Sequence, residues 1–259
     1  MVVADLHVHT TNSDGTLALG DLPAAARAAD LEAVAVTDHD RLHPDLEAPV
    51  TTRDGLTVVH GIELRVDAGD QHVDLLGYGV RRTDALVAEV ERLQADRIER
   101  ARRIVDCLEE RLGVRLDVDF EPGVGRPHIA EAVAASPADH TVKSAFLELV
   151  GDGRPCYVAR AVPTFDRGRE LLADACGLVG LAHPFRYDDP EAALALTADL
   201  DAVERWYPYR SEFDPAPVEA AVASHGLVPT GGSDAHGEDL GAAGLDRAAF
   251  ETVREHVEP

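Results

Sequence analysis

The feature that most constrains the fold is an alternation of short apolar runs with amphipathic, helix-like segments. Between several of the runs lie helix-like segments such as 22–29, 165–175 and 215–225. This βαβα order is typical of a parallel sheet or barrel, so the sequence predicts an α/β barrel. The seven runs that read as strands are residues 2–6, 33–36, 56–62, 73–76, 178–182, 202–206 and 228–231.

A long helical stretch interrupts this alternation. Residues 84–112 are charged and carry apolar residues at helical spacing, and Gly113 is expected to end the helix. Further helical sequence continues to about residue 150. We therefore expect a first barrel part at 1–81, a mainly helical insertion at 82–156 and a second barrel part at 157–259.

Length and composition indicate a chain that folds alone. With 259 residues, 45% of them hydrophobic, it can bury a large core. No run approaches the ~20 apolar residues of a membrane span, and the first residues lack the pattern of a signal peptide. We expect a cytoplasmic protein with no membrane partner; no motif indicates its oligomeric state.

The charge balance is strongly acidic. There are 48 acidic and 24 basic residues, a formal net charge of −24, and the acidic residues are spread over the chain. High salt screens such self-repulsion, so we hypothesise a halophilic protein. The same charge argues against stable capture of nucleic acid, which normally uses a basic surface.

The cysteines indicate no metal site. Cys107, Cys156 and Cys176 are far apart and form no Cys-x-x-Cys motif. We expect them to be small buried hydrophobic residues, with no disulfide framework.

Polar residues follow most of the predicted strands. His7 and His9 are two residues apart, so on a strand they would share a face. In an α/β barrel the carboxyl ends of the strands converge on one face, where catalytic residues lie. The residues expected to share this face are His7, His9, Asp14, His39, Glu63, His72, His183, Asp234 and His236.

This residue set suits a multinuclear metal site. Nitrogen and carboxylate ligands without thiolates favour zinc, manganese or iron, and nine candidates exceed the needs of one ion. Two or three divalent ions fit better, and such sites suit hydrolysis of phosphate esters by metal-activated hydroxide.

Five motifs carry most of these residues: DLHVHTTNSDG at 5–15, TDHD at 37–40, GIE at 61–63, AHP at 182–184 and GGSDAH at 231–236. Together they resemble the PHP (polymerase and histidinol phosphatase) superfamily of metal-dependent phosphoesterases. The resemblance implies a distorted seven-stranded α/β barrel with three metals. It implies that Glu63 bridges two of these ions. The other ligands of the first ion would be His7, His9 and Asp234, and the other ligands of the second ion would be His72 and His183. Asp14, His39 and His236 would hold the third, and His128 is an alternative to His72.

The helical insertion resembles one branch of that superfamily. GRPHIAEAVAA at 125–135 and AFLELVGDGRPCYV at 145–158 look like the branch with nucleotide phosphatases and a 5'-3' exoribonuclease. In that branch the GRPH segment meets the substrate. The resemblance therefore implies that Arg126 and His128 act on the substrate, and we add Arg186 because a guanidinium grips phosphate through two bonds.

The expected function is hydrolysis of nucleotide phosphate esters, with a nucleoside 3',5'-bisphosphate or the 5' end of a short RNA as substrate. One alternative is a histidinol-phosphatase-like enzyme for a small phosphomonoester. Another is a non-catalytic metal-binding module that acts in nucleic-acid binding or regulation.

Overall fold

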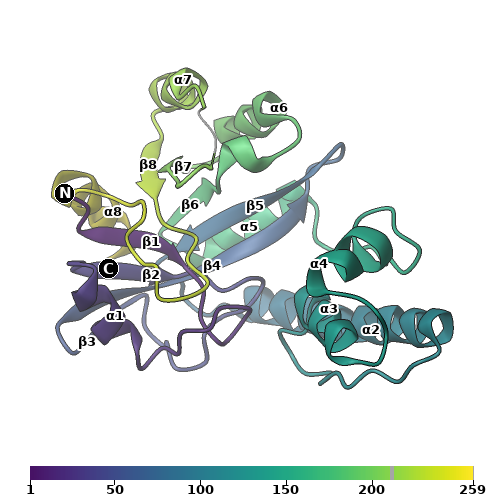
Figure 1. Cartoon of the computed structure of the whole chain (residues 1–259). Coiled ribbons are helices and arrows are strands. Elements are labelled where there is room, and N and C mark those ends of the chain that lie inside the picture. The colour runs from purple at the N-terminus through teal and green to yellow at the C-terminus, as the bar shows by residue number, and fades with distance from the viewer. Residues whose placement is uncertain (211–212, 259) are drawn as a thin grey trace. The chain divides into compact units, whose positions relative to one another are not determined.

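The computed structural model describes residues 1–210 and 213–258. These residues form two compact units, one of Met1–Val90 with Val162–Pro259 and the other of Glu91–Ala161 (Figure 1). Each unit has its own buried core.

The first unit is built on one curled sheet. Along it the strands follow the order β1-β2-β4-β5-β6-β7-β8, and β3 pairs with β4 on the side. The sheet confirms the predicted seven strands; β3, which sequence reasoning missed, is short and only partly buried. The strands are β1 (Ala4–Val8), β2 (Ala33–Val36), β3 (Val50–Arg53), β4 (Leu56–Asp67), β5 (His72–Tyr78), β6 (Leu178–Leu181), β7 (Ala202–Trp206) and β8 (Val228–Gly231).

Strand β5 departs from the parallel order that the sequence predicts. It runs antiparallel to both β4 and β6, whereas β1, β2 and β4 run parallel, as do β6, β7 and β8. Only residues 68–71 join β4 to β5. A parallel crossover needs a dozen or more residues, so this connection can make only a hairpin. The result is the distorted α/β barrel that the motifs predict.

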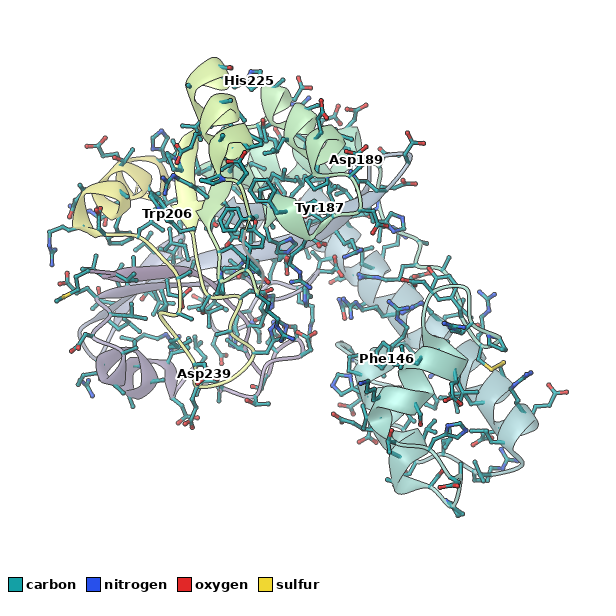
Figure 2. The ribbon with its side chains drawn as sticks, turned by 45° about the horizontal axis from the view of Figure 1, so that its top comes forward. Phe146, Tyr187, Asp189, Trp206, His225 and Asp239 are labelled. Carbon is teal, nitrogen blue, oxygen red and sulfur yellow. A yellow bond between two sulfur atoms is a disulfide. The ribbon has the colours of Figure 1, made fainter. Side chains whose placement is uncertain are left out.

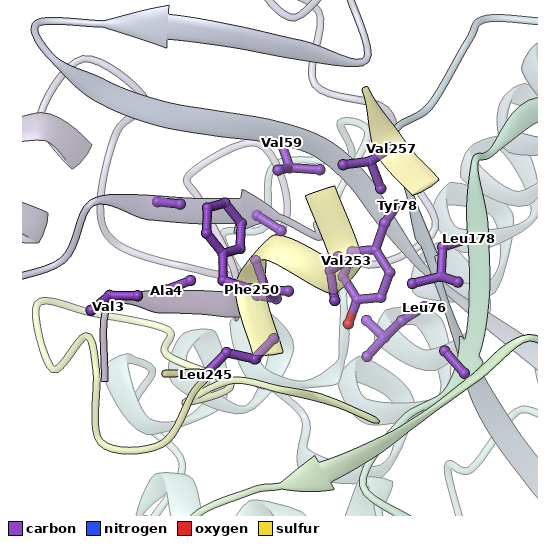
Figure 3. Packing of buried hydrophobic residues seen from close by; sticks show 14 of the residues in the cluster. Val3, Ala4, Val59, Leu76, Tyr78, Leu178, Leu245, Phe250, Val253 and Val257 are labelled. Carbon is purple, nitrogen blue, oxygen red and sulfur yellow. The ribbon is translucent and has the colours of Figure 1, made fainter. Parts of the chain in front are cut away.

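Two hydrophobic cores cover the two faces of the sheet. Ala33 and Ala35 of β2 pack in one core, and Val34 and Val36 pack in the other. Alternate residues of a strand point to opposite faces, so a strand buried on both faces is apolar throughout. Helix α8 (Arg247–Val257) covers the first face, as Figure 3 shows, and α1 (Leu22–Ala28) covers the second.

In the described part of the first unit, three further helices and two 3-10 turns connect the strands. Figure 2 labels Tyr187, which follows η2, and Trp206, which ends β7. The elements are α5 (Phe165–Ala175), the 3-10 turns η2 (Pro184–Arg186) and η3 (Leu196–Asp199), α6 (Pro190–Ala195) and α7 (Ala216–His225).

The second unit is helical. Helix α2 (Asp84–Leu112), which begins in the first unit, has the bounds that the sequence predicts, and Gly113 follows it with a positive φ of 68°. Glycine adopts this conformation without strain, which explains why the helix ends there. The unit also contains α3 (Arg126–Ala135), α4 (Val142–Ala145) and a π-helical turn, η1 (Phe146–Val150).

A disulfide joins Cys107 to Cys156 in the second unit, which corrects the expectation that no cysteines pair. The two residues are 49 positions apart, and only the folding of the segments between them brings their Cα atoms to 5.6 Å. Cys176 is free, and burial raises the pKa of its thiol to about 12.

Among the described residues, no helix is both long enough and apolar enough to span a bilayer.

Candidate metal centre

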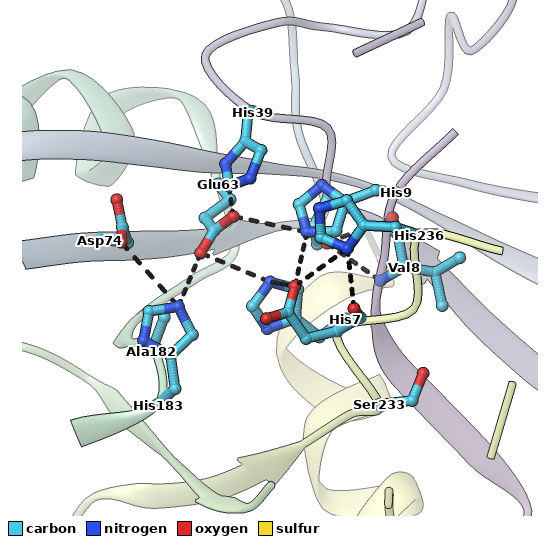
Figure 4. A network of polar contacts seen from close by, with 12 residues as sticks. His7, Val8, His9, His39, Glu63, Asp74, Ala182, His183, Ser233 and His236 are labelled. Carbon is cyan, nitrogen blue, oxygen red and sulfur yellow. Dashed lines mark hydrogen bonds and ion pairs between the residues drawn. The ribbon is translucent and has the colours of Figure 1, made fainter. Parts of the chain in front are cut away.

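The polar residues that follow β1, β2, β6 and β8 meet around Glu63 of β4 (Figure 4). Glu63 is fully buried and lies inside its strand, because β4 continues five residues past the predicted end. His9 N–H donates to the Ala235 carbonyl at 2.9 Å, which brings the segments after β1 and β8 together.

Three groups of side chains bring their potential ligand atoms within 4.8 Å of one another. We call them sites A, B and C. His9 belongs to both A and B, and Glu63 to both A and C, so the sites are neighbours. Site A is His7, His9, Glu63 and Asp234; site B is His9, Asp14, His39 and His236; site C is Glu63, Asp74 and His183.

Site A is a deeply buried set of nitrogen and oxygen donors. Nε2 of His9 lies 3.0 Å from Asp234 Oδ1 and 3.4 Å from Glu63 Oε2. Nε2 of His7 lies 3.5 Å from both Glu63 Oε1 and Asp234 Oδ1. Two histidines and two carboxylates make a donor set that suits zinc, manganese or iron.

Site B is more open. Asp14 Oδ1 lies 3.4 Å from His236 Nε2, and Asp14 Oδ2 lies 3.7 Å from His39 Nε2. The side chains of His39 and His236 are 27% and 40% exposed, so an ion at this site could meet a substrate from solvent.

Unsatisfied buried atoms indicate that sites A and B fit metal ions. His7 Nε2 and both ring nitrogens of His9 are buried and make no hydrogen bond, and the same holds for Asp14 Oδ1. Buried polar atoms without partners are rare because they cost desolvation free energy. A divalent cation that accepted their lone pairs would remove this cost.

Two residues of the site, Glu63 and His9, are in the protonation state that metal ligation needs. Burial by itself would raise the pKa of the Glu63 carboxyl, but His39 and His7 hold it well below its usual range. Burial lowers the pKa of His9 to about 4, with the nearby charge of His39 acting in the same direction. Ionised carboxylates and a neutral imidazole are the forms that bind metals. At His39, burial by itself would lower the pKa, but Glu63 and Asp14 raise it to about 9.

A buried carboxylate holds two of the histidines. Glu204 of β7 is fully buried; its Oε1 lies 3.0 Å from His7 Nδ1, and its Oε2 accepts from the His183 backbone N–H at 2.7 Å. A carboxylate on the far nitrogen of a ligand histidine fixes the ring and its tautomer. The sequence signal for Glu204 was one acidic residue in an apolar strand, which sequence reasoning did not use.

Asp38 anchors the loop after β1. Its carboxylate accepts from the Thr10 N–H at 2.7 Å, the Thr10 hydroxyl at 2.8 Å, Asn12 Nδ2 at 3.0 Å and the Ser13 hydroxyl at 2.8 Å. These bonds hold the loop that carries His9 and Asp14.

The GGSDAH motif packs against His7. A Cβ on Gly232 would lie 2.3 Å from the His7 backbone nitrogen, so only glycine fits there. Ser233 donates from its hydroxyl to Asp5 Oδ2 at 2.5 Å, which makes it a structural residue of the turn. The next residue, Asp234, has a positive φ of 53°, a conformation that aspartate tolerates better than most residues.

Site C contains Asp74 where the resemblance implied His72. Glu63 pairs with Leu76 across the β4–β5 hairpin, Arg65 pairs with Asp74, and His72 lies at the start of β5. Asp74 is therefore the diagonal neighbour of Glu63, and His72 lies a further two residues along the strand. The structure does not bring His72 into any of the three sites.

Arg186 lies beside site A. Its Nη1 donates to Asp234 Oδ2 at 2.7 Å and to the Tyr207 hydroxyl at 2.9 Å, and its side chain is 51% exposed. Both bonds orient the guanidinium while half of the side chain remains open to solvent.

Arg126 and His128 begin helix α3 in the second unit. Arg126 pairs with Asp152 at 2.8 Å, and its guanidinium lies 5.6 Å from the centroid of the Tyr157 ring. His128 Nδ1 accepts from the Gly125 N–H at 3.2 Å.

A curled β-sheet covered by helices, with histidines and carboxylates gathered where several of its strands end, defines an α/β protein that can bind metal ions. The chain belongs to the PHP domain family, whose sequence profile matches residues 5–141. The family that the motifs predicted is therefore confirmed.

Characterised relatives cover nearly the whole chain. A 3',5'-nucleoside bisphosphate phosphatase of Chromobacterium violaceum is 29% identical over 93% of this chain and 91% of its own length. A phosphoribosyl 1,2-cyclic phosphate 1,2-diphosphodiesterase of Eggerthella lenta is 30% identical over 92% and 95%. The 5'-3' exoribonuclease Rnm of Escherichia coli is 26% identical over 91% and 85%.

A solved structure confirms the fold. A crystal structure from Bifidobacterium adolescentis, provisionally described as a metal-dependent phosphoesterase, superposes with a TM-score of 0.80 and 25% identity. The match covers 98% of this chain and 96% of that one.

Proposed function

We propose that this protein is a metal-dependent phosphoesterase that hydrolyses phosphate esters of nucleotides. The observation that carries the proposal is the pair of adjacent sites A and B, which share His9 at one edge of the sheet. Metal ions bound there would supply hydroxide near neutral pH and neutralise phosphate charge. Manganese, zinc and iron all suit the ligands.

The chain's own residues position the substrate. Arg186 is held by Asp234 and Tyr207, and its exposed guanidinium can donate two hydrogen bonds to a phosphate group. We keep Arg126 and His128 as predicted substrate residues, His128 as a proton donor or a contact to the leaving group.

An aromatic cluster beside Arg186 supports a nucleotide as substrate. The Tyr207 ring centroid lies 5.5 Å from that of His183 and 4.7 Å from that of Tyr209, and the Phe213 ring lies 4.5 Å from that of Tyr209. The Phe213 side chain is exposed. Aromatic rings next to a phosphate site offer a surface on which a nucleobase can stack.

The relatives support this substrate class. They act on a nucleoside bisphosphate, a phosphoribosyl cyclic phosphate and RNA, according to their names. We infer a nucleoside 3',5'-bisphosphate as the first candidate. A ribose cyclic phosphate is the second, because the Eggerthella lenta relative aligns over 92% of this chain.

Phosphate release from a panel of substrates tests the proposal. The panel, with manganese at high salt, contains a nucleoside 3',5'-bisphosphate, a ribose 1,2-cyclic phosphate, a 5'-phosphorylated RNA oligomer, a nucleoside monophosphate and histidinol phosphate. We expect the bisphosphate to be hydrolysed fastest. Preference for histidinol phosphate would contradict the proposal that the substrate is a nucleotide. No turnover of any of the five compounds would contradict the proposal that the protein is an enzyme.

His7→Ala is the matching variant. Because His7 belongs to site A, we expect the His7→Ala variant to bind less metal and to lose nearly all turnover. Full turnover with unchanged metal content would refute the site. His225→Gln, an exposed substitution on α7, is the control.

We keep two further predictions about the protein in the cell. It lies in the cytoplasm, and it forms no stable complex with nucleic acid. Disulfides are rare in the reducing cytosol of most organisms, so alkylation of thiols before lysis would test the first prediction through Cys107 and Cys156.

A further inference from the structure

The guanidinium of Arg65 lies against the carboxylate of site C. Arg65 Nη1 donates to Asp74 Oδ2 at 3.0 Å and is 3.3 Å from Asp74 Oδ1. The register of the β4–β5 hairpin places the two residues directly opposite one another. The Asp74 side chain is 5% exposed and that of Arg65 is 37% exposed, so the arginine lies between the carboxylate and solvent.

Site A has an arginine too, but the contact differs. Arg186 bonds only to Oδ2 of Asp234, while Oδ1 faces the two histidines of site A. The Asp234 carboxylate therefore keeps one oxygen for a metal ion. At site C, Arg65 contacts both oxygens of Asp74, so neither oxygen is free of the guanidinium.

The charge of Arg65 also opposes a cation at site C. A cation bound to Asp74 at a usual metal–oxygen distance of about 2 Å would lie within about 5 Å of the Arg65 nitrogen. Two positive charges this close repel strongly where solvent screening is weak. The rest of site C is small: His183 Nε2 lies 2.9 Å from Glu63 Oε1 and 3.9 Å from Asp74 Oδ2. A third ion therefore fits these residues poorly.

We propose that this protein binds two metal ions, at sites A and B, and that the guanidinium of Arg65 takes the place of the third cation at site C. His183 then holds Glu63 through a hydrogen bond. The three-metal arrangement that the resemblance implied does not apply to this chain.

Arg65 also has hydrogen-bond donors to offer a ligand. Both contacts to Asp74 use Nη1, and a guanidinium carries five N–H groups in a planar fork. We infer that the remaining groups bind phosphate, the part of the inference that rests on the proposed function.

Counting metals tests the first part without any measurement of activity. The protein is loaded with manganese, freed of unbound metal by gel filtration and analysed by mass spectrometry of the element. We expect two equivalents for each chain. Three equivalents would overturn the proposal, and so would fewer than two.

A neutral version of the pair isolates site C. The double variant Arg65→Gln, Asp74→Asn removes both charges and keeps the size of the Asp74 side chain. We expect it to keep two equivalents of manganese, because Asp74 is not a metal ligand. A fall to one equivalent would show that Asp74 binds a metal and would overturn the proposal.

Inorganic phosphate tests the second part. Calorimetric titration of the manganese-loaded protein should show phosphate affinity about tenfold weaker in the double variant, because a charged hydrogen-bond donor is lost. Unchanged affinity would refute phosphate binding by Arg65 and leave the metal count standing. The control is Arg247→Gln, Glu32→Gln, which neutralises an exposed ion pair outside the site.

Discussion

Glu204 shows how a residue outside the three metal sites can control them. Its two oxygens hold the His7 ring and the His183 backbone, and the amide of a glutamine could accept only one of these bonds. We expect Glu204→Gln to weaken manganese binding about 10- to 100-fold, the usual effect of losing a partner behind a ligand histidine. Competition with a metal chelator would measure the change.

The control for this variant is Glu191→Gln, an exposed carboxylate on α6. Thermal unfolding of both variants without metal would separate a folding defect from a binding defect. Manganese affinity in Glu204→Gln equal to that of the unmodified protein would contradict the role of Glu204.

His60, which belongs to none of the three metal sites, should make the stability of the fold depend on pH. It is fully buried in β4, and neither nitrogen of its ring makes a hydrogen bond. Burial, with Arg82 acting in the same direction, lowers its pKa to about 3. An unfolded histidine has a pKa of about 6.5. Because the unfolded chain binds the proton more tightly, stability is complete above about pH 6.5 and falls as the pH drops toward about 3.

His60→Leu should remove this loss. Between pH 7 and pH 5 the free energy of unfolding should fall by about 2 kcal/mol less than in the unmodified protein. Urea unfolding at both pH values, with chelator present, measures the difference. An equal pH dependence in both proteins would contradict the prediction, and His225→Gln, an exposed histidine, should change nothing.

At the scale of elements, Tyr207 after β7 contacts both the metal centre and the aromatic cluster: its hydroxyl donates to Asp234, and its ring packs on that of Tyr209. Tyr209 is the middle of that cluster, with rings of Tyr207, Phe185 and Phe213 around it. Stacking on a base contributes about 1–3 kcal/mol. We expect Tyr209→Ala to raise the KM for a nucleoside bisphosphate about fivefold to 100-fold.

The control substrate for the Tyr209→Ala variant is the ribose bisphosphate that remains when the nucleoside bisphosphate lacks its base. Its KM should stay nearly constant in Tyr209→Ala. An equal rise for both substrates would show that the ring supports the site generally and does not bind the base.

At the scale of the whole molecule, the net charge of −24 predicts a dependence on salt. The Debye length falls from about 10 Å at 0.1 M salt to about 3 Å at 1 M, which screens repulsion between acidic side chains. We expect the Tm to rise by at least about 2 °C over this range, which corresponds to ~1 kcal/mol for a chain of this size. Calorimetric scans at fixed metal concentration would measure it.

An uncharged osmolyte is the control for salt. Sucrose at matched osmolality stabilises by exclusion from the surface and does not screen charge. A Tm that is the same at both salt concentrations, or that rises equally with sucrose, would contradict the halophilic hypothesis.

The sequence alone determined the family, the seven strands of the sheet and eight members of the three sites. These follow from local signals, since the apolar runs mark buried strands and the motifs lie where the strands end. The eight residues that the structure brings together are His7, His9, Asp14, His39, Glu63, His183, Asp234 and His236.

The tertiary structure alone decided which residues face one another across segments distant in the chain. Asp74 is in site C because of the register of the β4–β5 hairpin, and that register also lays Arg65 on its carboxylate. Glu204 reaches His7 from a strand 197 residues away, and Cys107 meets Cys156 across 49. Register and long-range pairing depend on the packing of the whole sheet, so no local pattern of residues reveals them.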